Sequence, residues 1–431
     1  MDTIPFHLIL VALDMVVFWG LFLWIRSRRN NVSTRAAVRQ FEKSLFVPTP
    51  RRRSPSLVWD LGGVLLCGSV GLVGFVILSQ LIATDTMQEH VYRFNVGQSI
   101  AEGIALHGTL FLIVSAALLC WNRRQLCAII FSGSALLFAA LGYYMLYWEP
   151  YHLKVEYYKI TTPKVTKPLR IVFVSDIQTD TIGSHEINTL KKIQEQNADL
   201  IILGGDYIHT FADTPEKRLP EKFRQLFLDY PLEAPLGVYA LPGNVGGHDG
   251  VNDAELFKDT SVEYSRQTAV YQLGEDEGWE LPITLVLLSA AHSHNGFAGH
   301  SSRNFSERSL MESGFLVIMA GHFPHYAVDG YTDPATNTPG KGYRNAEKAP
   351  DLMLAGHTHG GQIVLPFYGP VWQKETTLQQ IPLSMWKGFF TYPNGGHLLV
   401  TRGTGMKRGW APRIRLFCPP EISVIDIVPP E

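Results

Sequence analysis

Long apolar runs are concentrated in the first third of the chain. Four of them reach the length of about 20 residues that a helix needs to cross a hydrocarbon core. They cover approximately residues 5–25, 57–83, 100–121 and 126–148. One such run also suits a buried helix of a soluble protein, but four in succession favour four transmembrane helices in a membrane domain of residues 1–150. The first run is not typical of a cleaved signal peptide, because its basic residues follow the apolar stretch.

The pattern changes after Pro150. Residues 151–168 form a mostly polar connector, and from Leu169 onwards short apolar runs alternate with polar, glycine-rich loops. Such runs predict strands, here over residues 170–175, 200–203, 238–241, 283–288, 315–320, 351–355, 398–401 and 422–427. The helical spacing of Ile187, Leu190 and Ile193 predicts a helix over residues 186–196. We therefore expect an α/β or α+β domain over residues 169–431.

Positive charge is unevenly divided among the loops of the first third. Nine Lys and Arg residues lie between the first two apolar runs, and Arg123 and Arg124 lie between the third and fourth. Basic loops stay in the cytoplasm, so the chain after Trp148 is expected outside it. This predicts a multi-pass protein of the cell (inner) membrane with an extracytoplasmic C-terminal domain. A basic run could instead bind nucleic acid, but between two spans it indicates topology, so we expect a lipid bilayer and no nucleic acid as partner.

Cysteine adds little to this picture. Of the four cysteines, only Cys418 lies in the C-terminal domain. No disulfide framework is therefore available to that domain, and its stability must come from a packed core.

Polar residues follow five of the predicted strands directly. Asp176 and Asp206 come after the first two strands, and Asn244, His322 and the His357–Thr358–His359 run come after later ones. One Asp after a strand is commonly a helix cap or turn former, but a helix cap does not explain this whole set. Residues two apart at a strand end face the same way, so His357 and His359 can converge on one point. Together these residues favour a metal site at the strand ends.

These positions carry the motifs of a known family. The chain shows SDIQ, GGDY, GNVGGHD, AGHFP and AGHTHGGQI in that order. This order resembles the calcineurin-like metallophosphoesterases, whose blocks are Asp-x-His, Gly-Asp, Gly-Asn-His-Asp or Glu, Gly-His and Gly-His-x-His. The resemblance runs from about Leu169 to the end. The final VTRGTG and RIRLFCPPEISVIDI segments also look like the membrane-associated bacterial branch, which includes phosphodiesterases and pyrophosphohydrolases of lipid-linked substrates.

The resemblance implies a layered α/β sandwich that holds two divalent metal ions. It assigns Asp176, His359 and the Gln178 position to the first ion, and Asp206 to both ions. It assigns Asn244, His322 and His357 to the second. Two ions ~3.5 to 4 Å apart can hold a hydroxide nucleophile and neutralise phosphoryl oxygens. Imidazole, carboxylate and amide ligands without thiolate favour Mn, Fe or Zn over calcium.

Two departures from the family pattern concern the reaction directly. Gln178 stands where the family usually has His, and its neutral amide oxygen is a poorer donor than imidazole. His185 could replace that ligand, or it could be a surface or first-turn residue of the following helix. In GNVGGHD, three residues separate Asn244 from His248. His248 could still act as general acid with Asp249 orienting it; the alternative is a mobile loop and catalysis by the metals alone.

Other residues offer weaker hypotheses. His325 could line the cleft or be a solvated loop histidine, and Arg344 and Arg402 are candidate phosphate contacts. Several aromatic residues could rest on the bilayer or pack in the core; these are Trp372, Trp386, Phe389, Phe390 and Tyr392. Residues 329–347, rich in Gly, Pro, Asn and charge, predict a loop that could cover the site.

The sequence therefore predicts a membrane-bound hydrolase. We expect metal-dependent hydrolysis of a phosphoester or pyrophosphate bond, such as that of a phosphodiesterase, in a phospholipid or other lipid-linked substrate. An inverted topology would favour a cytoplasmic lipid-sugar nucleotide pyrophosphohydrolase. The altered first and third motifs leave a second class open, a catalytically impaired metal-binding domain that serves as a sensor or assembly partner of the membrane helices.

Overall fold

The computed structural model divides the chain into two compact units. The first comprises Met1–Tyr144 with Gly409–Pro412, and the second comprises Met145–Arg408 with Arg413–Glu431. The structure describes residues 125–209, 218–245, 252–274, 282–296, 314–329, 341–371, 380–406 and 413–431, with short stretches or single residues at 105, 108–110, 112–113, 115–117, 301–302, 305–306 and 332.

One long apolar helix precedes the second unit along the chain. Helix α5 covers Gln125–Tyr143 and continues through a π-helical turn, Tyr144–Trp148, into a 3₁₀ turn, Glu149–Tyr151. Among the described residues, only Gln125–Tyr151 is both long and apolar enough to cross a membrane. It coincides with the predicted fourth span. The predicted spans 5–25 and 57–83 lie outside the described residues, and 100–121 is described only in fragments, so the four-span membrane domain stays a prediction.

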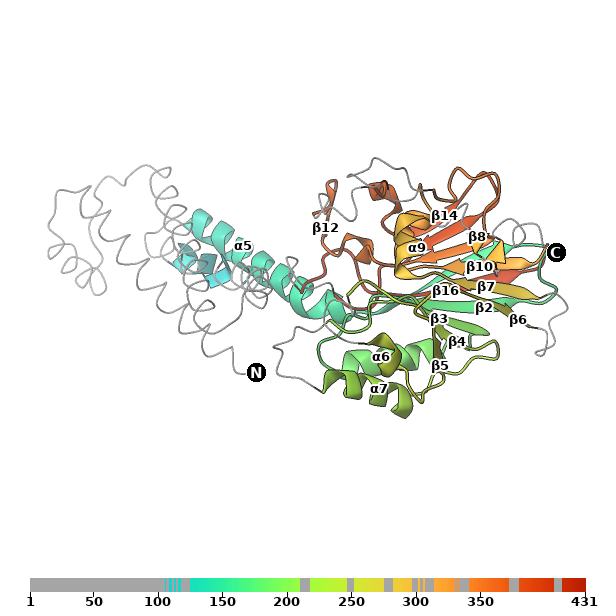
Figure 1. Cartoon of the computed structure of the whole chain (residues 1–431). Coiled ribbons are helices and arrows are strands. Elements are labelled where there is room, and N and C mark those ends of the chain that lie inside the picture. Colours follow the sequence, from blue (N-terminus) through green and yellow to red (C-terminus); the bar gives the residue numbers. More distant parts are fainter. Residues whose placement is uncertain are drawn as a thin grey trace, which may run out of the picture. The chain divides into compact units, whose positions relative to one another are not determined.

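The second unit is built on two six-stranded sheets (Figure 1). The first sheet has the order β1–β16–β2–β3–β4–β5, and the second has the order β14–β15–β11–β10–β7–β6. The strands of the first sheet are β1 Lys154–Thr161, β16 Glu421–Val428, β2 Leu169–Val174, β3 Leu200–Leu203, β4 Val238–Ala240 and β5 Val262–Tyr264. Those of the second are β14 Gly388–Thr391, β15 His397–Val400, β11 Leu352–Ala355, β10 Leu316–Ala320, β7 Ile283–Leu287 and β6 Ala269–Leu273.

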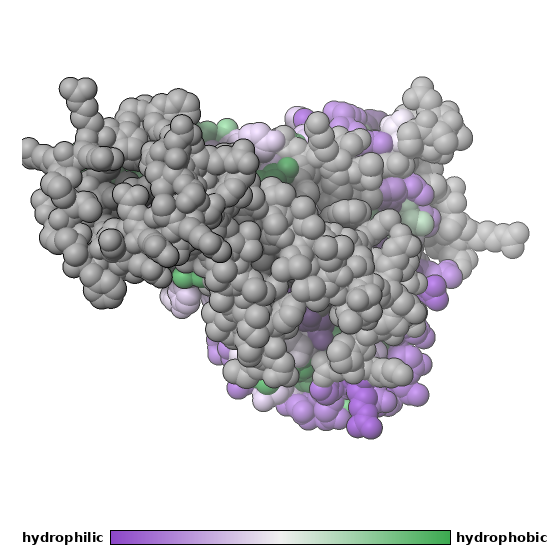
Figure 2. All heavy atoms as spheres, turned by 90° about the vertical axis from the view of Figure 1, so that its left-hand side faces the viewer, coloured by the Kyte–Doolittle hydropathy of each residue, from purple (hydrophilic) through white to green (hydrophobic). Residues whose placement is uncertain are grey.

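Short elements complete the unit. The helices are α6 Ser184–Gln194, α7 Leu219–Asp229, α8 Asp253–Leu256 and α9 Ala290–Asn295, with 3₁₀ turns at Pro324–Tyr326, His359–Gly361 and Leu383–Met385. Two small hairpins pair β8 Ser301–Ser302 with β9 Phe305–Ser306 and β12 Val364–Leu365 with β13 Gly369–Pro370. In Figure 1, α6 and α7 lie below the first sheet, on the side away from β10 and β14. Hydrophilic residues dominate the described surface along the lower edge of Figure 2.

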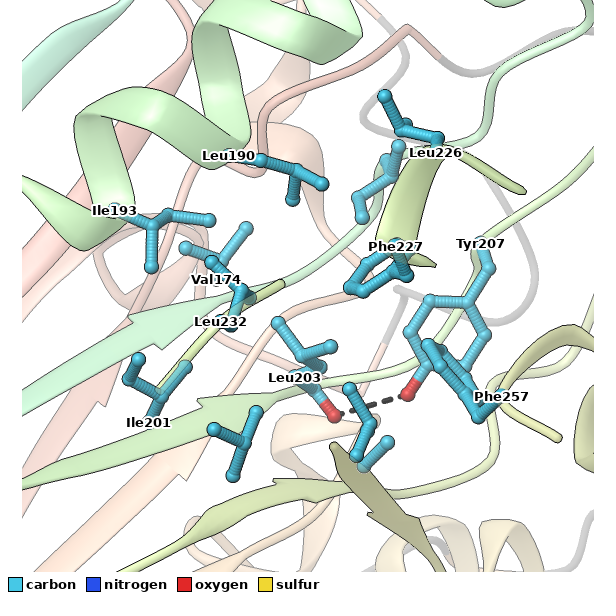
Figure 3. Packing of buried hydrophobic residues seen from close by; sticks show 14 of the residues in the cluster. Val174, Leu190, Ile193, Ile201, Leu203, Tyr207, Leu226, Phe227, Leu232 and Phe257 are labelled. Carbon is cyan, nitrogen blue, oxygen red and sulfur yellow. Dashed lines mark hydrogen bonds between the residues drawn. The ribbon is translucent and has the colours of Figure 1, made fainter. Parts of the chain in front are cut away.

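Strand alternation explains how the layers pack. In β2, Ile171 and Phe173 point between the two sheets, while Val172 and Val174 point towards the helices. The helix side is closed by buried residues of α6 and α7, among them Leu190, Leu226 and Phe227 (Figure 3). A third apolar cluster, which includes Trp386, covers the outer face of the second sheet. The layered α/β sandwich predicted from the sequence is therefore the fold of this unit.

Strand direction brings the predicted site residues to one edge. β2, β3, β4 and β5 run parallel to one another, and so do β7, β10, β11 and β15. The carboxyl ends of parallel strands meet at the same edge of a sheet, where ligand sites collect in layered folds. β1 lies within the predicted connector and pairs in parallel with β16 over its whole length, from Lys154 beside Glu421 to Thr161 beside Val428.

Candidate metal centre

The chain leaves β2, β3 and β11 in an unusual backbone conformation. Asp176, Asp206 and His357 have φ of 55°, 58° and 69°, and Gln178 and His359 have φ of 38° and 48°. This left-handed region is uncommon for residues other than glycine and persists only where surrounding contacts enforce it. Each strained residue carries a polar side chain into the same buried region, which points to a functional site rather than to simple turns.

Glycines allow the loops to approach one another. A Cβ on Gly243 would overlap the Asp206 carboxylate and backbone nitrogen, and one on Gly356 would overlap Ser175 Oγ and Asp176 Oδ2. The loop after β4 can therefore lie close to the loop after β3, and the loop after β11 close to the loop after β2, only because these positions lack a side chain.

Four side chains, from the loops that follow β3, β4, β10 and β11, form the tightest group. His322 Nε2 lies 2.9 Å from Asn244 Oδ1 and 3.3 Å from Asp206 Oδ2. His357 Nδ1 lies 2.9 Å from Asn244 Oδ1 and 3.3 Å from His322 Nε2. One ligand atom each of Asp206, His322 and His357 lies within 4.8 Å of the others, and all three residues are buried. Such a spacing suits a single cation at the centre of the group.

The Asp176 side of the site is built differently. Asp176 Oδ2 accepts a hydrogen bond from the His357 backbone N–H at 2.9 Å, and Asp176 Oδ1 lies 3.4 Å from His359 Nε2. Asp206 contacts residues on both sides. Its Oδ1 accepts from the backbone N–H groups of Asn244 and Val245 at 2.7 and 2.9 Å, and its Oδ2 faces the site. The predicted ligands from Asp176 to His359 thus converge on one region.

Gln178 points into the same region. Its Nε2 donates to Asp206 Oδ2 at 2.7 Å, and its backbone N–H donates to the Asp206 carbonyl at 2.8 Å. Its Oε1 is buried and accepts no hydrogen bond from the described residues. A buried amide oxygen without a donor is costly, so this atom is suited to a ligand.

Burial and proximity perturb the charges of this cluster. Burial raises the pKa of Asp176 to about 6, and the Asp206 charge adds to that shift. Burial alone would also raise the pKa of Asp206, but the charge of His322 and several hydrogen bonds hold it well below its usual range. For His322, burial opposes protonation, yet the Asp206 carboxylate raises its pKa to about 9. In the metal-free site a proton on His322 therefore supplies positive charge to the carboxylates.

Comparison with known proteins agrees with this arrangement. A sequence model described as calcineurin-like phosphoesterase matches residues 169–361. These residues form a calcineurin-like phosphoesterase domain.

Three relatives match this chain over most of their own length. An uncharacterized metallophosphoesterase of Aquifex aeolicus is 26% identical over 65% of this chain and 93% of its own. The uncharacterized metallophosphoesterase YkuE of Bacillus subtilis is 29% identical over 71% of this chain and 97% of its own. The UDP-2,3-diacylglucosamine pyrophosphatase LpxG of Chlamydia trachomatis is 25% identical over 60% and 83%. Among solved structures, a dimetal phosphatase of Danio rerio covers 55% of this chain and 88% of its own, at 10% identity and a TM-score of 0.31. The family match to residues 169–361 and the metallophosphoesterase relatives support a phosphoester hydrolase, and this family uses divalent metals.

The residues of the phosphoesterase domain fit such ions. The donors are two buried carboxylates, three imidazoles and two amides, a set that suits divalent transition metals. His322 Nδ1 lies 2.9 Å from the Gly204 carbonyl, and a carbonyl oxygen can only accept, so Nδ1 carries a proton. This contact leaves the lone pair of Nε2 for a metal, which is the usual way in which a ligand histidine is oriented.

Several predicted residues lie elsewhere or outside the described residues. His248 and Asp249 fall within residues 246–250, which the structure does not describe, so their roles stay predictions. His185 Nε2 contacts the Thr404 carbonyl at 2.9 Å and packs against Tyr151, so in this structure it is a first-turn residue of α6. His325 is buried and packs beside His294 and Phe323, so the solvated-loop interpretation is wrong.

The candidate phosphate contacts have other partners. Arg402 lies 2.7 Å from Glu156 Oε1 and 2.9 Å from Glu421 Oε2, and exposed Arg344 lies 3.6 Å from Asp329. Of the aromatic candidates, Trp386 and Tyr392 are buried in the third apolar cluster, Phe390 packs against that cluster and Phe389 packs against the core between the sheets. Trp372 lies outside the described residues.

Arg415 supports the site and escaped the sequence analysis. It is fully buried, and its guanidinium donates to the backbone carbonyls of Arg402, Gly403, Gly405 and Cys418. The loop that it holds contacts the first motif, because Thr404 N–H donates to the Ser175 carbonyl and Gly405 N–H to that of Asp176. The only signal in the sequence is one Arg between the apolar residues Ile414 and Leu416.

Proposed function

We propose that this protein hydrolyses a phosphoester or pyrophosphate bond of a lipid-linked substrate at a membrane surface, with two divalent ions of Mn, Fe or Zn. The observation that carries the proposal is the convergence of buried Asp176, Asp206, His322 and His357 with the Asn244 amide at the facing strand ends. When bound, the two ions would activate water and neutralise the charge that develops on the phosphoryl oxygens.

Each residue has a role in this proposal. Asp176, Gln178 and His359 would hold one ion; Asn244, His322 and His357 would hold the other; Asp206 would bridge them. The backbone N–H groups of Asn244 and Val245 fix Oδ1 of Asp206 at 2.7 and 2.9 Å, which sets the direction of the bridging carboxylate. His248 would protonate the leaving oxygen, with Asp249 orienting its imidazole.

The lipid-linked substrate rests on two supports. LpxG is named for a substrate, UDP-2,3-diacylglucosamine, that carries both a pyrophosphate and acyl chains. Helix Gln125–Tyr151 is also apolar and long enough to anchor the domain at a bilayer. The basic segment between the first two apolar runs further favours a multi-pass anchor in the cell membrane and an extracytoplasmic domain.

The test is hydrolysis of bis-p-nitrophenyl phosphate by the purified full-length protein with added Mn. Asp206→Asn should lower kcat by about 10³-fold or more, since losing the bridging charge disrupts both ion sites. Asp259→Asn is the matched control, because Asp259 is 73% exposed and lies outside every motif. Metal binding without hydrolysis of any phosphomonoester, phosphodiester or pyrophosphate would reject the enzyme and leave a metal-binding role.

One observation favours that second candidate function. Gln178 Nε2 already donates a hydrogen bond to Asp206 Oδ2 at 2.7 Å. A neutral amide thus contacts the carboxylate proposed to bridge the ions, at the position where the family pattern has an imidazole. A catalytically impaired domain that senses metal or assembles with the membrane helices would show metal-dependent stability without turnover.

A further inference from the structure

The second unit displays exposed aromatic side chains beside its metal centre. We call the aromatic surface the set Tyr147, Trp148, Tyr151, Phe367, Tyr368 and Phe417. Phe367 is fully exposed at the tip of the β12–β13 hairpin, Tyr368 is 61% exposed, and the other four are each about half exposed or more. Scattered single apolar residues are ordinary on a protein surface, so the question is whether these belong to one structure.

Hydrogen bonds tie the parts of the aromatic surface together. Val364 N–H, at the start of the hairpin, donates to the Leu416 carbonyl at 2.9 Å, and Leu416 N–H donates to the Gln362 carbonyl at 3.1 Å. The next residue, Phe417, donates its N–H to Glu149 Oε2 at 2.7 Å. Glu149 is buried and immediately follows Trp148 at the end of the apolar helix. Two backbone hydrogen bonds therefore connect the hairpin to Leu416, and one from the Phe417 N–H to the Glu149 carboxylate connects the next residue to the helix end.

Backbone strain shows that the two phenylalanines are not incidental. Phe367 has φ of 65° and Phe417 has φ of 53°. Glycine or asparagine fits this left-handed region best, and a bulky side chain there is disfavoured. The rings at these two strained positions lie on the surface rather than in the core, as is expected of side chains that contact an apolar partner.

We infer that the aromatic surface inserts into the headgroup region of a lipid bilayer. The apolar helix Gln125–Tyr151 ends in Tyr147, Trp148 and Tyr151, and Tyr and Trp are the residues that gather at the ends of membrane spans. Phe417 is hydrogen-bonded to Glu149 at that helix end and the hairpin to Leu416, so a bilayer reached by the helix end also lies close to both. The hairpin begins three residues after Gly361, the last residue of the 3₁₀ turn that carries His359.

Contact of the aromatic surface with a bilayer would determine how a substrate reaches the metal centre, and this consequence rests on the proposed function. A metal centre next to an inserted hairpin would take a substrate whose phosphate lies at the membrane surface while its acyl chains stay in the bilayer. The insertion itself does not depend on hydrolysis, so the two can be tested separately.

The experiment places p-benzoylphenylalanine at position 367 or 368 of the full-length protein in vesicles of phosphatidylethanolamine and phosphatidylglycerol. After irradiation, mass spectrometry should find lipid adducts at these positions. The control is the same residue at Val270 on β6, which is 36% exposed and lies at the opposite end of the domain from β12 in Figure 1. Adduct yield at 367 should exceed that at 270 by about tenfold, as expected for an interfacial against an aqueous position.

Three outcomes would overturn the inference: equal yields at 367 and 270, no adduct at 367 or 368, or cross-links to a second copy of the chain instead of lipid. Asp206→Asn should leave the lipid adducts unchanged. Adducts in an inactive protein would reject the hydrolase and keep the membrane contact, whereas activity without adducts would do the reverse.

Discussion

At the scale of single residues, Gln178 separates this chain most clearly from the pattern of its family. Its buried Oε1 accepts no hydrogen bond from the described residues, and its Nε2 holds Asp206 Oδ2. Gln178→His should strengthen metal binding by about tenfold or more, because imidazole is the better donor for these ions. Calorimetric titration with Mn checks this, with exposed Gln225→His on α7 as control. Equal affinities in the two variants would mean that position 178 is not a ligand.

His322 predicts a pH dependence of the metal-free protein. Its pKa is raised from 6.5 to about 9. The stabilisation it gives is therefore complete below pH 6.5 and is lost as the pH rises through about 9. Asp176, with a pKa of about 6 in the folded state, destabilises the fold as the pH rises from 3.8 to 6 and changes little above that window.

Thermal unfolding in chelator should thus show a Tm that falls by a few degrees between pH 6.5 and 9. Saturating Mn should abolish this slope, because the ion replaces the proton on His322. A metal-free protein with constant or rising Tm across that window would contradict the assignment of charge in the cluster.

At the scale of elements, Tyr207 holds together the two strand ends that carry the site. It follows Asp206 directly and is buried. Its hydroxyl lies 3.0 Å from the carbonyl of Leu203, the last residue of β3, and 2.7 Å from that of Leu241, just past β4 (Figure 3 shows the first contact). Tyr207→Phe should lower the free energy of unfolding by about 1–3 kcal/mol, since buried carbonyls lose their donor. Urea denaturation measures this. Tyr157→Phe is the control, because its hydroxyl bond to Gln196 is exposed and should contribute near zero.

The elements that could be predicted from the sequence are those specified locally. β3 consists of four buried residues in an uninterrupted apolar run, and its predicted bounds match those observed. Asp176, Asp206 and His357 stand directly after such runs, so their meeting followed from parallel strands. The edge strands β5 and β6 are half exposed and had no such run, and α7 begins beside residues rich in charge and proline. Arg415 could not be found, because its role is to bind carbonyls of a loop ten residues away.

At the scale of the whole molecule, the orientation of the chain in the membrane is the main remaining prediction. The basic segments before the second and fourth apolar runs predict that residues after Trp148 lie outside the cytoplasm. Alkaline phosphatase fused after Thr161, the last residue of β1, should therefore be active. A cytoplasmic reporter at the same point should be silent. An inactive phosphatase with an active cytoplasmic reporter would invert the topology and place the metal centre in the cytoplasm.

Glu149 determines where the chain can be cut. Its carboxylate accepts from the N–H groups of both Phe417 and Cys418, and Arg415 N–H donates to the Met145 carbonyl. A fragment that starts at Leu169, where the family match begins, would lose these acceptors and also β1, which pairs with β16 along eight residues. The N–H groups of Phe417 and Cys418 would then lose their acceptor, close to Arg415, whose guanidinium holds the loop against Asp176. A soluble catalytic fragment should therefore begin no later than Met145. A protease that cuts the chain after Tyr151 would release a domain that lacks the hydrogen bonds of Glu149 to Phe417 and Cys418 and that of Met145 to Arg415.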